Sequence, residues 1–584
     1  MRITRRLSHA GAALAAAAAL LLAAAPSGGA AAPAAAPPVE VNYQNPVSAL
    51  APVSRPDTPH CAVTAMQHDF ANSYGQPFTG TLTPPGACPG PWSKVVLDWS
   101  GSVAGRQFDR LAGVWIGGAE VFRTSTPEPD PAGISWHVDA DLSRYIPLLR
   151  TPQPLAVDLG NIVDGTYTGI YHMTLTVTYY QADRAHPPAA TADQVIPVSQ
   201  GTAGAGWWSL TAGQSATQTV AFPRNLSAAT LEVYARGGGC EEFWYTNVPD
   251  AYNAAHPGYG LCGGGPYREV QVEVDGRIAG VAQPFPAIYS GGISPTMWRP
   301  IMSVDSLRTQ PYDLDLTPFA GLLSDGQPHR ITLLPPAGIT DVWTMDGSLL
   351  LTTDHHAAHT GGGLLTDTIA AAPALSSGWT TPSTGTDVIT TTASRAWTVS
   401  GYVNTSHGRV VTTVKQHVAY TNTDTVTQAG FAQSVVQQDK GYTEVSTSGG
   451  HAADNAVDNT AAGSTADHAT RDSWSYPITV SSVYQPSGTG SGFLVQGTVD
   501  VARITATDAV TDTAHGNAWR TTEHVNDHVT AHGVLQRDDS GTVVQADGAD
   551  AQDYFEQSAG VGCYHHRIEA DHGYVTSDRL LGCR

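Results

Sequence analysis

Charged residues are scarce in this sequence. Asp, Glu, Lys and Arg make up 14% of the 584 residues, and 29 basic residues stand against 51 acidic ones, which gives a formal net charge of −22. A chain that binds nucleic acid needs a basic surface to neutralise phosphates, so this composition argues against nucleic acid as a partner. It suits an exoprotein with a neutral substrate.

Long apolar runs are also missing after the N-terminus, which argues against a membrane-spanning helix. Residues 1–32 have the pattern of a signal peptide. Three arginines lie within the first six residues, an apolar run covers 12–25, and small residues suited to cleavage lie at 30–32. We therefore expect a secreted, extracellular protein with no membrane association.

Cysteine is rare as well, with six in the chain, and no C-x-x-C pair typical of zinc sites occurs. A secreted chain favours disulfides, and each consecutive pair of cysteines closes a short loop. The simplest connectivity joins Cys61 to Cys88, Cys240 to Cys262, and Cys563 to Cys583. We expect these disulfides rather than a metal site.

Turn-forming and strand-forming residues, by contrast, are abundant. The chain has 60 glycines and 39 prolines with many Thr and Val residues, a composition typical of an all-β protein. No long pattern of helical period competes with the strand patterns. The clearest predicted strands are KVVLDW (94–99), GVWIGGAEVF (113–122), YHMTLTVTYY (171–180) and the hairpin EVQVEVDGRIAGVA (269–282), in which Asp275-Gly276 supplies the turn.

These patterns predict two consecutive β-sandwiches, over residues 41–185 and 186–355. After them the composition shifts toward Thr, Ser, Asp and Ala. We expect 356–584 to be a further β-rich region of unknown role. Its strand patterns cover 396–422 and 492–510, and a flexible stretch is expected across 447–470.

Few carboxylates have unusual neighbours. Asp109 lies between Phe108 and Arg110, just before an apolar strand. Successive residues of a strand point to opposite faces, but at a strand entry Asp109 and Arg110 can converge. A surface ion pair is the alternative for this motif, since such pairs are common and weak.

A second candidate site is the stretch GGGCEEFWYTN, residues 237–247. Strand alternation would place Glu241 and Glu242 on opposite faces, so at most one of them enters a shared site. The three aromatics could stack on sugar rings, and apolar surroundings raise the pKa of a carboxyl, as acid–base chemistry requires. A polar loop beside a disulfide is the alternative.

Other patterns favour a structural interpretation. The histidines lack a carboxylate-rich frame for a metal, and the paired aspartates fit a strand edge. A serine hydrolase is disfavoured, because no nucleophile elbow lies between a strand and a helix. These weaker candidates are His355, His356, His359, His565, His566, Asp313 and Asp315.

Five ordered blocks between about residues 41 and 352 resemble the peptide-N-glycosidase A family. They are GRQFDRLAGVWIGGAEVFR, LAVDLGNIVDGTYTGIYH, EEFWYTN, GPYREVQVEVDGRIAGVAQPFPAIYSGGISPTMWRPI and YDLDLTPFAGLLSDGQPHRITL. The resemblance implies two eight-stranded jelly rolls side by side with the site between them. It also implies a cofactor-free amidase that hydrolyses the bond between the innermost N-acetylglucosamine and asparagine, leaving aspartate and a glycosylamine.

The bacterial peptide-N-glycosidase F type is similar in short pieces only. Its catalytic aspartate lies in a Trp-Asp-Arg sequence that looks like residues 108–110, which implies Asp109. Its essential glutamate lies in Cys-Ala-Glu-Trp, which implies Glu242 rather than Glu241. A further glutamate of that type has no clear match, and Asn161 or Asp158 is the nearest substitute.

The expected mechanism makes Asp109 the general base that activates water. Glu242 either positions the water or the substrate amide, or supplies a proton to the leaving nitrogen. The remaining expected substrate-binding residues are Arg110 and Arg299 for the carbonyl oxygen, Trp244 and Tyr245 for the chitobiose core, and Asn161.

Two other functions stay open from sequence alone. A secreted, non-catalytic glycan-binding sandwich would also have exposed aromatics, although binding does not require both Asp109 and Glu242. A two-carboxylate endoglycosidase would cut the glycosidic bond instead. In each case we expect a monomeric protein whose partner is an N-glycosylated peptide or protein.

Overall fold

The structure is a computed structural model that describes residues 42–201, 206–449, 468–487, 490–510, 519–559 and 561–583. The expected signal peptide at 1–32 and most of the 447–470 stretch lie outside these residues. The described chain is almost entirely antiparallel β-structure, which confirms the predicted all-β class. None of its helices is long and apolar enough to cross a membrane.

The first sandwich consists of two four-stranded sheets, ordered β1-β8-β3-β6 and β2-β7-β4-β5. This is the connectivity of a jelly roll. Its strands are β1 (His60–Phe70), β2 (Phe78–Leu82), β3 (Trp92–Val103), β4 (Leu111–Ile116), β5 (Ala119–Ser125), β6 (Ile134–Asp141), β7 (Gln153–Leu159) and β8 (Tyr171–Gln181). Side chains of β8 alternate: Tyr171, Met173, Leu175 and Val177 are buried in the core between the sheets.

The second sandwich repeats this connectivity, with sheets ordered β10-β17-β12-β15 and β11-β16-β13-β14, and an extra strand β9 beside β17. The predicted hairpin is confirmed as β13 and β14, with both turn residues, Asp275 and Gly276, at positive φ. The strands are β9 (Gln194–Val198), β10 (Trp208–Leu210), β11 (Ala216–Ala221), β12 (Leu226–Gly237), β13 (Val270–Val274), β14 (Arg277–Ala282), β15 (Tyr312–Asp315), β16 (Pro328–Leu334) and β17 (Trp343–Thr353).

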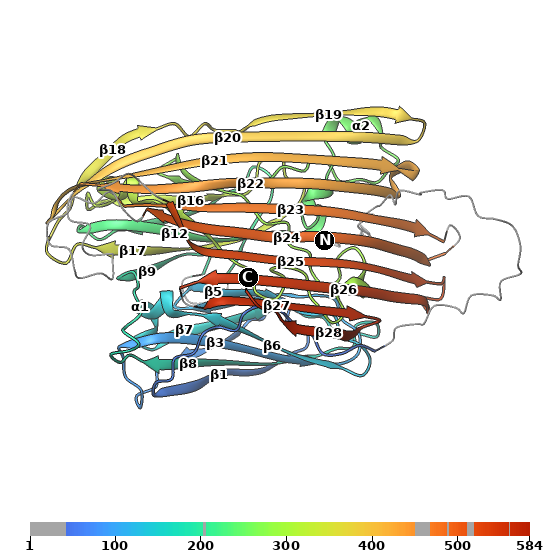
Figure 1. The fold of residues 1–584 in the computed structure, drawn as a ribbon, viewed down its shortest axis with the longest axis horizontal. Coiled ribbons are helices and arrows are strands. Elements are labelled where there is room, and N and C mark those ends of the chain that lie inside the picture. The colour runs from blue at the N-terminus through green and yellow to red at the C-terminus, as the bar shows by residue number, and fades with distance from the viewer. Residues whose placement is uncertain are drawn as a thin grey trace, which may run out of the picture.

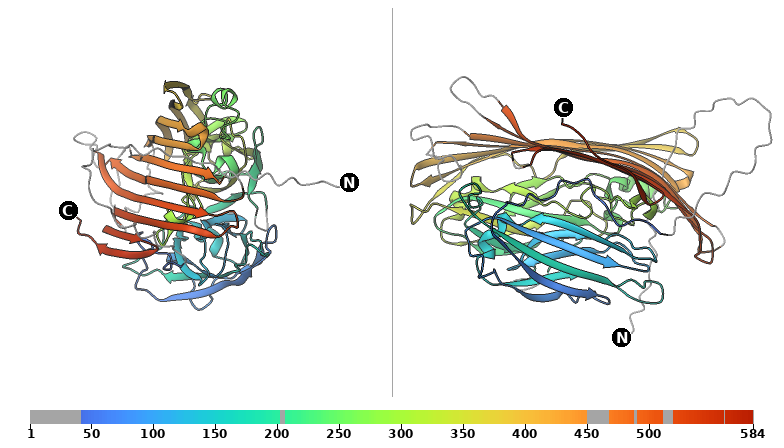
Figure 2. Two further views of the ribbon diagram at one scale, coloured as in Figure 1. Left: turned by 90° about the vertical axis from the view of Figure 1, so that its right-hand side faces the viewer. Right: turned by 60° about the horizontal axis from the view of Figure 1, so that its bottom comes forward.

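The C-terminal region is one long sheet of 11 strands that covers both sandwiches as a third layer (Figures 1 and 2). Its strands are β18 (Gly362–Asp367), β19 (Ala374–Ser383), β20 (Thr386–Thr405), β21 (Gly408–Thr427), β22 (Ala432–Ser448), β23 (His468–Pro486), β24 (Phe493–Val510), β25 (Trp519–Arg537), β26 (Val543–Ser558), β27 (Gly562–Asp571) and β28 (Tyr574–Leu580). Its inner side chains, among them Trp397, Val480 and Val529, belong to the same hydrophobic core as the second sandwich.

Short helices interrupt the loops. Helical periodicity could not have predicted them, because none exceeds two turns. They are η1 (Ser143–Tyr145), α1 (Ile146–Leu149), η2 (Gly239–Glu241), η3 (Trp244–Thr246), α2 (Asp250–Ala255), η4 (Pro295–Trp298), η5 (Thr317–Phe319), α3 (Ala320–Leu323) and η6 (Gln428–Gly430), where η marks a 3₁₀ helix. All three expected disulfides are confirmed, and Cys240–Cys262 closes the loop that contains η3 and α2.

Truncating Trp397 tests the shared core. Trp397 is 6% exposed, so Trp397→Ala should lower the free energy of unfolding by about 3–5 kcal/mol. Because one core joins the long sheet to the second sandwich, the two should unfold in a single calorimetric transition. Trp397→Ala should lower the temperature of that transition. Trp379→Ala, at a site 39% exposed on β19, should cost much less. If the protein showed two transitions and Trp397→Ala lowered the temperature of only one of them, the sheet would unfold independently of the second sandwich.

Candidate active site

Asp109 lies in the loop between β3 and β4 and points toward the second sandwich. Its Oδ2 accepts a hydrogen bond of 3.0 Å from the backbone N–H of Gly291, in the loop between β14 and η4. The carboxylate is half-buried. Asp109 is therefore held at the junction of the two sandwiches, as expected for a residue of a site between them.

Buried polar side chains of the first sandwich hold the Asp109 loop by hydrogen bonds. Gln107 donates from Nε2 to the carbonyl oxygens of Ile162 (2.7 Å) and Gly169 (2.9 Å), and its Oε1 accepts from Arg110 at 2.7 Å. The hydroxyl of Tyr171 donates to the carbonyl of Phe108 at 2.8 Å. Because these hydrogen bonds form among buried groups, they restrain the loop that contains Asp109.

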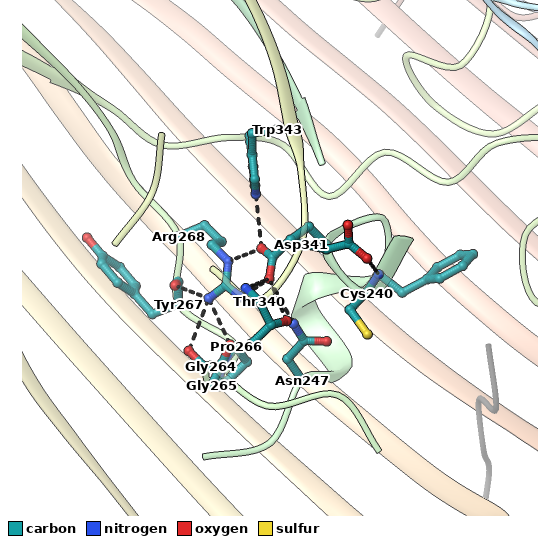
Figure 3. Close-up of polar contacts among 12 residues, drawn as sticks. Cys240, Asn247, Gly264, Gly265, Pro266, Tyr267, Arg268, Thr340, Asp341 and Trp343 are labelled. Atoms are coloured by element: carbon teal, nitrogen blue, oxygen red, sulfur yellow. Dashed lines mark hydrogen bonds and ion pairs between the residues drawn. The ribbon is translucent and has the colours of Figure 1, made fainter. Parts of the chain in front are cut away.

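Glu241 forms a fully buried ion pair with Arg268. Figure 3 labels Arg268 together with Thr340 and Trp343, which also donate to the Glu241 carboxylate. Its Oε2 accepts from Arg268 Nε at 2.6 Å and from Trp343 Nε1 at 3.0 Å, while Oε1 accepts from Arg268 Nη2 at 2.9 Å and the Thr340 N–H at 3.0 Å. Burial alone would raise the pKa of Glu241, but the bonds from Arg268 and its positive charge lower it below the ordinary value. Glu241 is thus a structural anion, and it points away from Glu242 as expected.

The turn of η2 directs Glu242 elsewhere. Gly239 has φ +60°, and a Cβ there would lie 2.0 Å from Asp341 Oδ2, so the turn requires glycine. Glu242 Oε1 lies 3.5 Å from Arg236 Nη2. Burial raises the pKa of Glu242, the charge of Arg236 opposes this, and the negative charge of Asp109 adds to the rise. Glu242 and Asp109 therefore interact electrostatically across the junction.

Arg236 is a component that sequence analysis missed. It lies at the end of β12 and stacks over the ring of Tyr289 at 4.2 Å. Burial lowers the pKa of Arg236, but electrostatic interactions with Tyr289, Glu242 and Asp109 raise it above its ordinary value. Its only sequence signal is a charged residue that ends the apolar strand LEVYAR just before the glycine turn. The site thus contains a cation that interacts with both carboxylates.

Glu128 is a second residue that the sequence did not reveal. A Cβ placed on Gly291 would lie 2.7 Å from Glu128 Oε1 and 3.4 Å from both carboxylate oxygens of Asp109. Burial, and then the negative charge of Asp109, raise the pKa of Glu128 to about 8, against the opposing charges of Arg299 and Arg106. Its only sequence signal is a rare acid in the proline-rich loop after β5.

The expected basic and amide residues lie around this cluster rather than in it. Arg110 is buried, with its guanidinium bound to Gln107. Arg299 stacks on Tyr43 at 5.0 Å, on the side of Glu128. Asn161 is fully buried and donates to the carbonyls of Phe70 and Gly169, so it supports the Asp109 loop indirectly and presents no surface to a substrate.

The expected aromatic wall needs correction. Tyr245 is fully buried in the core, and Trp244, 3% exposed, only lines a small pocket beside Glu242. The turn of η3 points both rings inward, which adjacency to Glu242 in sequence could not show. An exposed ring next to Asp109 is instead that of Phe108, which lies 4.6 Å from the half-buried ring of Tyr167.

The weaker candidates do not gather at the junction. His355 is exposed and pairs with Asp193, and Asp313 pairs with Arg144. Asp158 is half-buried on β7. Within the described ranges, no group of three or more His, Cys, Asp or Glu residues could hold a metal ion.

Two neighbouring cavities open near Glu242. The smaller is lined by Arg236, Glu242, Trp244 and Tyr289. A larger one, of about 700 Å³, lies between the sandwiches and the long sheet and shares Asp305 with the smaller. Asp109 lines neither of these two cavities.

Comparison with known proteins identifies the family of the chain. The family model of peptide N-acetyl-β-D-glucosaminyl asparaginase amidase A matches residues 46–368, and the model of the PNGase A C-terminal domain matches residues 388–478. A relative from Prunus dulcis, named peptide-N4-(N-acetyl-β-glucosaminyl)asparagine amidase A, is 36% identical over 404 residues. The match covers 66% of this chain and 70% of the relative.

Solved structures show a more distant likeness. PNGase F from Flavobacterium meningosepticum, described as a glycosylasparaginase, matches with a TM-score of 0.35 and 12% identity over 50% of this chain and 96% of its own. PNGF-II matches with a TM-score of 0.35 and 14% identity, over 52% of this chain and 66% of its own. At this distance neither structure bears on the site residues.

Replacing Glu241 tests its structural role. Glu241→Gln leaves Arg268 buried without its counter-charge, so the free energy of unfolding at neutral pH should fall by about 3–5 kcal/mol in chemical denaturation. Because the folded pKa of Glu241 is lowered, this contribution is complete above the unfolded pKa of about 4.3 and is lost as the pH falls below it. The matched variant Glu242→Gln should cost at most about 1 kcal/mol. Equal costs would contradict the assignment.

Proposed function

Because the chain belongs to the peptide N-acetyl-β-D-glucosaminyl asparaginase amidase A family, we propose that it hydrolyses the amide between the innermost N-acetylglucosamine and asparagine of N-linked glycopeptides or glycoproteins. The observation that carries this proposal is the meeting of Asp109 and Glu242, from two different sandwiches, around Arg236. Carbohydrate binding alone would not need such a cluster of charges.

In the proposed reaction Asp109 is the general base. It removes a proton from a water molecule as the water oxygen bonds to the side-chain amide carbon of the substrate asparagine. The carbon–nitrogen bond then breaks, which leaves aspartate in the peptide and releases the glycan as a glycosylamine. The Gly291 N–H bond supports this role, because it orients the Asp109 carboxylate without neutralising it.

Glu242 and Arg236 act on the amide itself. Burial and the charge of Asp109 raise the pKa of Glu242, but its carboxyl faces Arg236 at 3.5 Å, and we assign to it the role of accepting hydrogen bonds from the substrate amide or the attacking water. Arg236 lies 3.5 Å from Glu242 and also interacts electrostatically with Asp109, and we assign to it the positive charge that a developing oxyanion requires. It takes the role expected for Arg110, whose guanidinium is bound to Gln107.

Exposed rings are proposed to hold the sugar. Phe108 is 45% exposed and Tyr74 is 61% exposed, and the buried guanidinium of Arg110 lies between them, at 5.7 Å and 6.0 Å from the two ring centres. Flat apolar ring faces next to the catalytic base suit stacking against a pyranose ring. We place the innermost N-acetylglucosamine on this surface.

We further propose that the protein is secreted and acts as a monomer. Support for secretion comes from the signal-peptide pattern of residues 1–32 and from the three disulfides, which persist in oxidising compartments. An N-glycosylated peptide or protein is then the partner it meets outside the cell.

Replacement of Asp109 tests the base. Asp109→Asn should lower the rate of glycopeptide cleavage at least 10²-fold, since general base catalysis contributes about that much or more. Mass spectrometry of the peptide distinguishes the alternatives: an amidase leaves aspartate, an endoglycosidase leaves sugar on asparagine, and a binding protein leaves the substrate intact. The control is Asp183→Asn, at an exposed position in the segment of chain that connects the first sandwich to the second. Near-full activity of Asp109→Asn would refute the assignment.

A separate experiment tests which of the two adjacent glutamates lies in the site. Per folded molecule, Glu242→Gln should lose far more activity than Glu241→Gln, because only Glu242 faces the junction. Activity must be normalised to native protein, as Glu241→Gln is destabilised. If the two variants lose the same share of activity, Glu242 is not the site residue.

A further inference from the structure

We propose that Glu128 is a third carboxyl of the site and donates the proton that the leaving nitrogen requires, an inference that rests on the proposed amidase function. Without a proton the departing group would be an amide anion, which is a very poor leaving group. Sequence analysis gave this step to Glu242 as one of two alternative roles. The geometry around Gly291 points to Glu128.

The carboxyls of Glu128 and Asp109 both lie next to Gly291, near the position that a Cβ would occupy there. Their closest oxygens are 2.7 Å and 3.4 Å from one point, the position of a Cβ on Gly291, so they lie within about 6 Å of each other. Two carboxyls this close together can contact different atoms of one reacting group. Asp109 would contact the attacking water and Glu128 the nitrogen of the scissile bond.

Glu128 differs from Glu242 in its partners. Glu242 faces Arg236 at 3.5 Å. In the part of the chain described by the structure, the Glu128 carboxyl makes no ion pair within 4.0 Å and no hydrogen bond. It is half-buried beside the negative charge of Asp109, which favours its neutral, proton-donating form.

Charged side chains from both sandwiches and from the long sheet act on the pKa of Glu128. Asp109 raises its pKa, whereas Arg106 of the first sandwich, Arg299 after η4 and Arg537 at the end of β25 lower it. The hydroxyl of Tyr171 is also close, since Glu128 raises the pKa of that tyrosine. With a pKa of about 8, Glu128 keeps its proton below pH 8 and loses it as the pH rises further.

The proton balance closes without a further reactant. Asp109 gains a proton from water as the carbon–oxygen bond forms, and Glu128 loses one to nitrogen as the carbon–nitrogen bond breaks. The two carboxyls are close enough for the proton on Asp109 to return to Glu128 through solvent. The net reaction consumes one water and one amide and yields one carboxylic acid and one amine.

The test measures kcat, KM and the pH profile of glycopeptide cleavage for Glu128→Gln. We expect kcat to fall at least 10²-fold with KM nearly unchanged, and the decline of wild-type activity above pH 8 to disappear from the residual rate. Asp158→Asn is the matched control: it removes another half-buried carboxyl of the first sandwich whose pKa is raised by burial, and it should keep both the rate and the decline.

A second variant covers the case in which Glu128→Gln fails to fold. Gly291→Ala places a methyl 2.7 Å from the mobile end of Glu128 but at ordinary contact distance from Asp109, so it should displace only the Glu128 carboxyl. We expect a native melting temperature and a kcat lowered at least 10-fold. Wild-type kcat in either folded variant would overturn the role of Glu128. If the wild-type protein produced no aspartate, the proposed function itself would fail.

Discussion

The buried ion pair between Glu241 and Arg268 is the constraint on which the site depends. It fixes one glutamate of the pair in the core of the second sandwich, and the turn of η2 then leaves Glu242 to face Arg236. The Cys240–Cys262 disulfide anchors the same turn. A residue without catalytic chemistry therefore determines which of two adjacent glutamates reaches the junction.

Hydrogen bonds from the long C-terminal sheet stabilise the segments around this ion pair. Asn422 and Gln433 donate to the carbonyls of Tyr245 and Thr246, and the hydroxyl of Tyr420 donates to the carbonyl of Pro266, next to Arg268. The sheet also places Arg537 within electrostatic reach of Glu128. The region whose role the sequence left open thus supports the site and contributes to its charge.

Local patterns predicted much of the fold, because strand alternation and turn chemistry depend on neighbours in sequence. The Asp275-Gly276 hairpin and the strand over 171–180 are examples. Asp109 and Glu242 could be chosen by motif. Arg236 and Glu128 could not, because each enters the site only through contacts with distant segments, Tyr289 and Gly291. The prediction that Tyr245 contacts the substrate was wrong for the same reason. Tyr245 is close to Glu242 in the sequence, but its side chain packs into the core.

The central claim is that this chain breaks a carbon–nitrogen bond by adding water to the asparagine side chain. The most direct measurement is cleavage of an N-glycopeptide in isotopically labelled water, with mass spectrometry of both products. The account predicts one labelled oxygen in the side chain of the new aspartate. Label on the sugar alone, with N-acetylglucosamine still attached to asparagine, would contradict it.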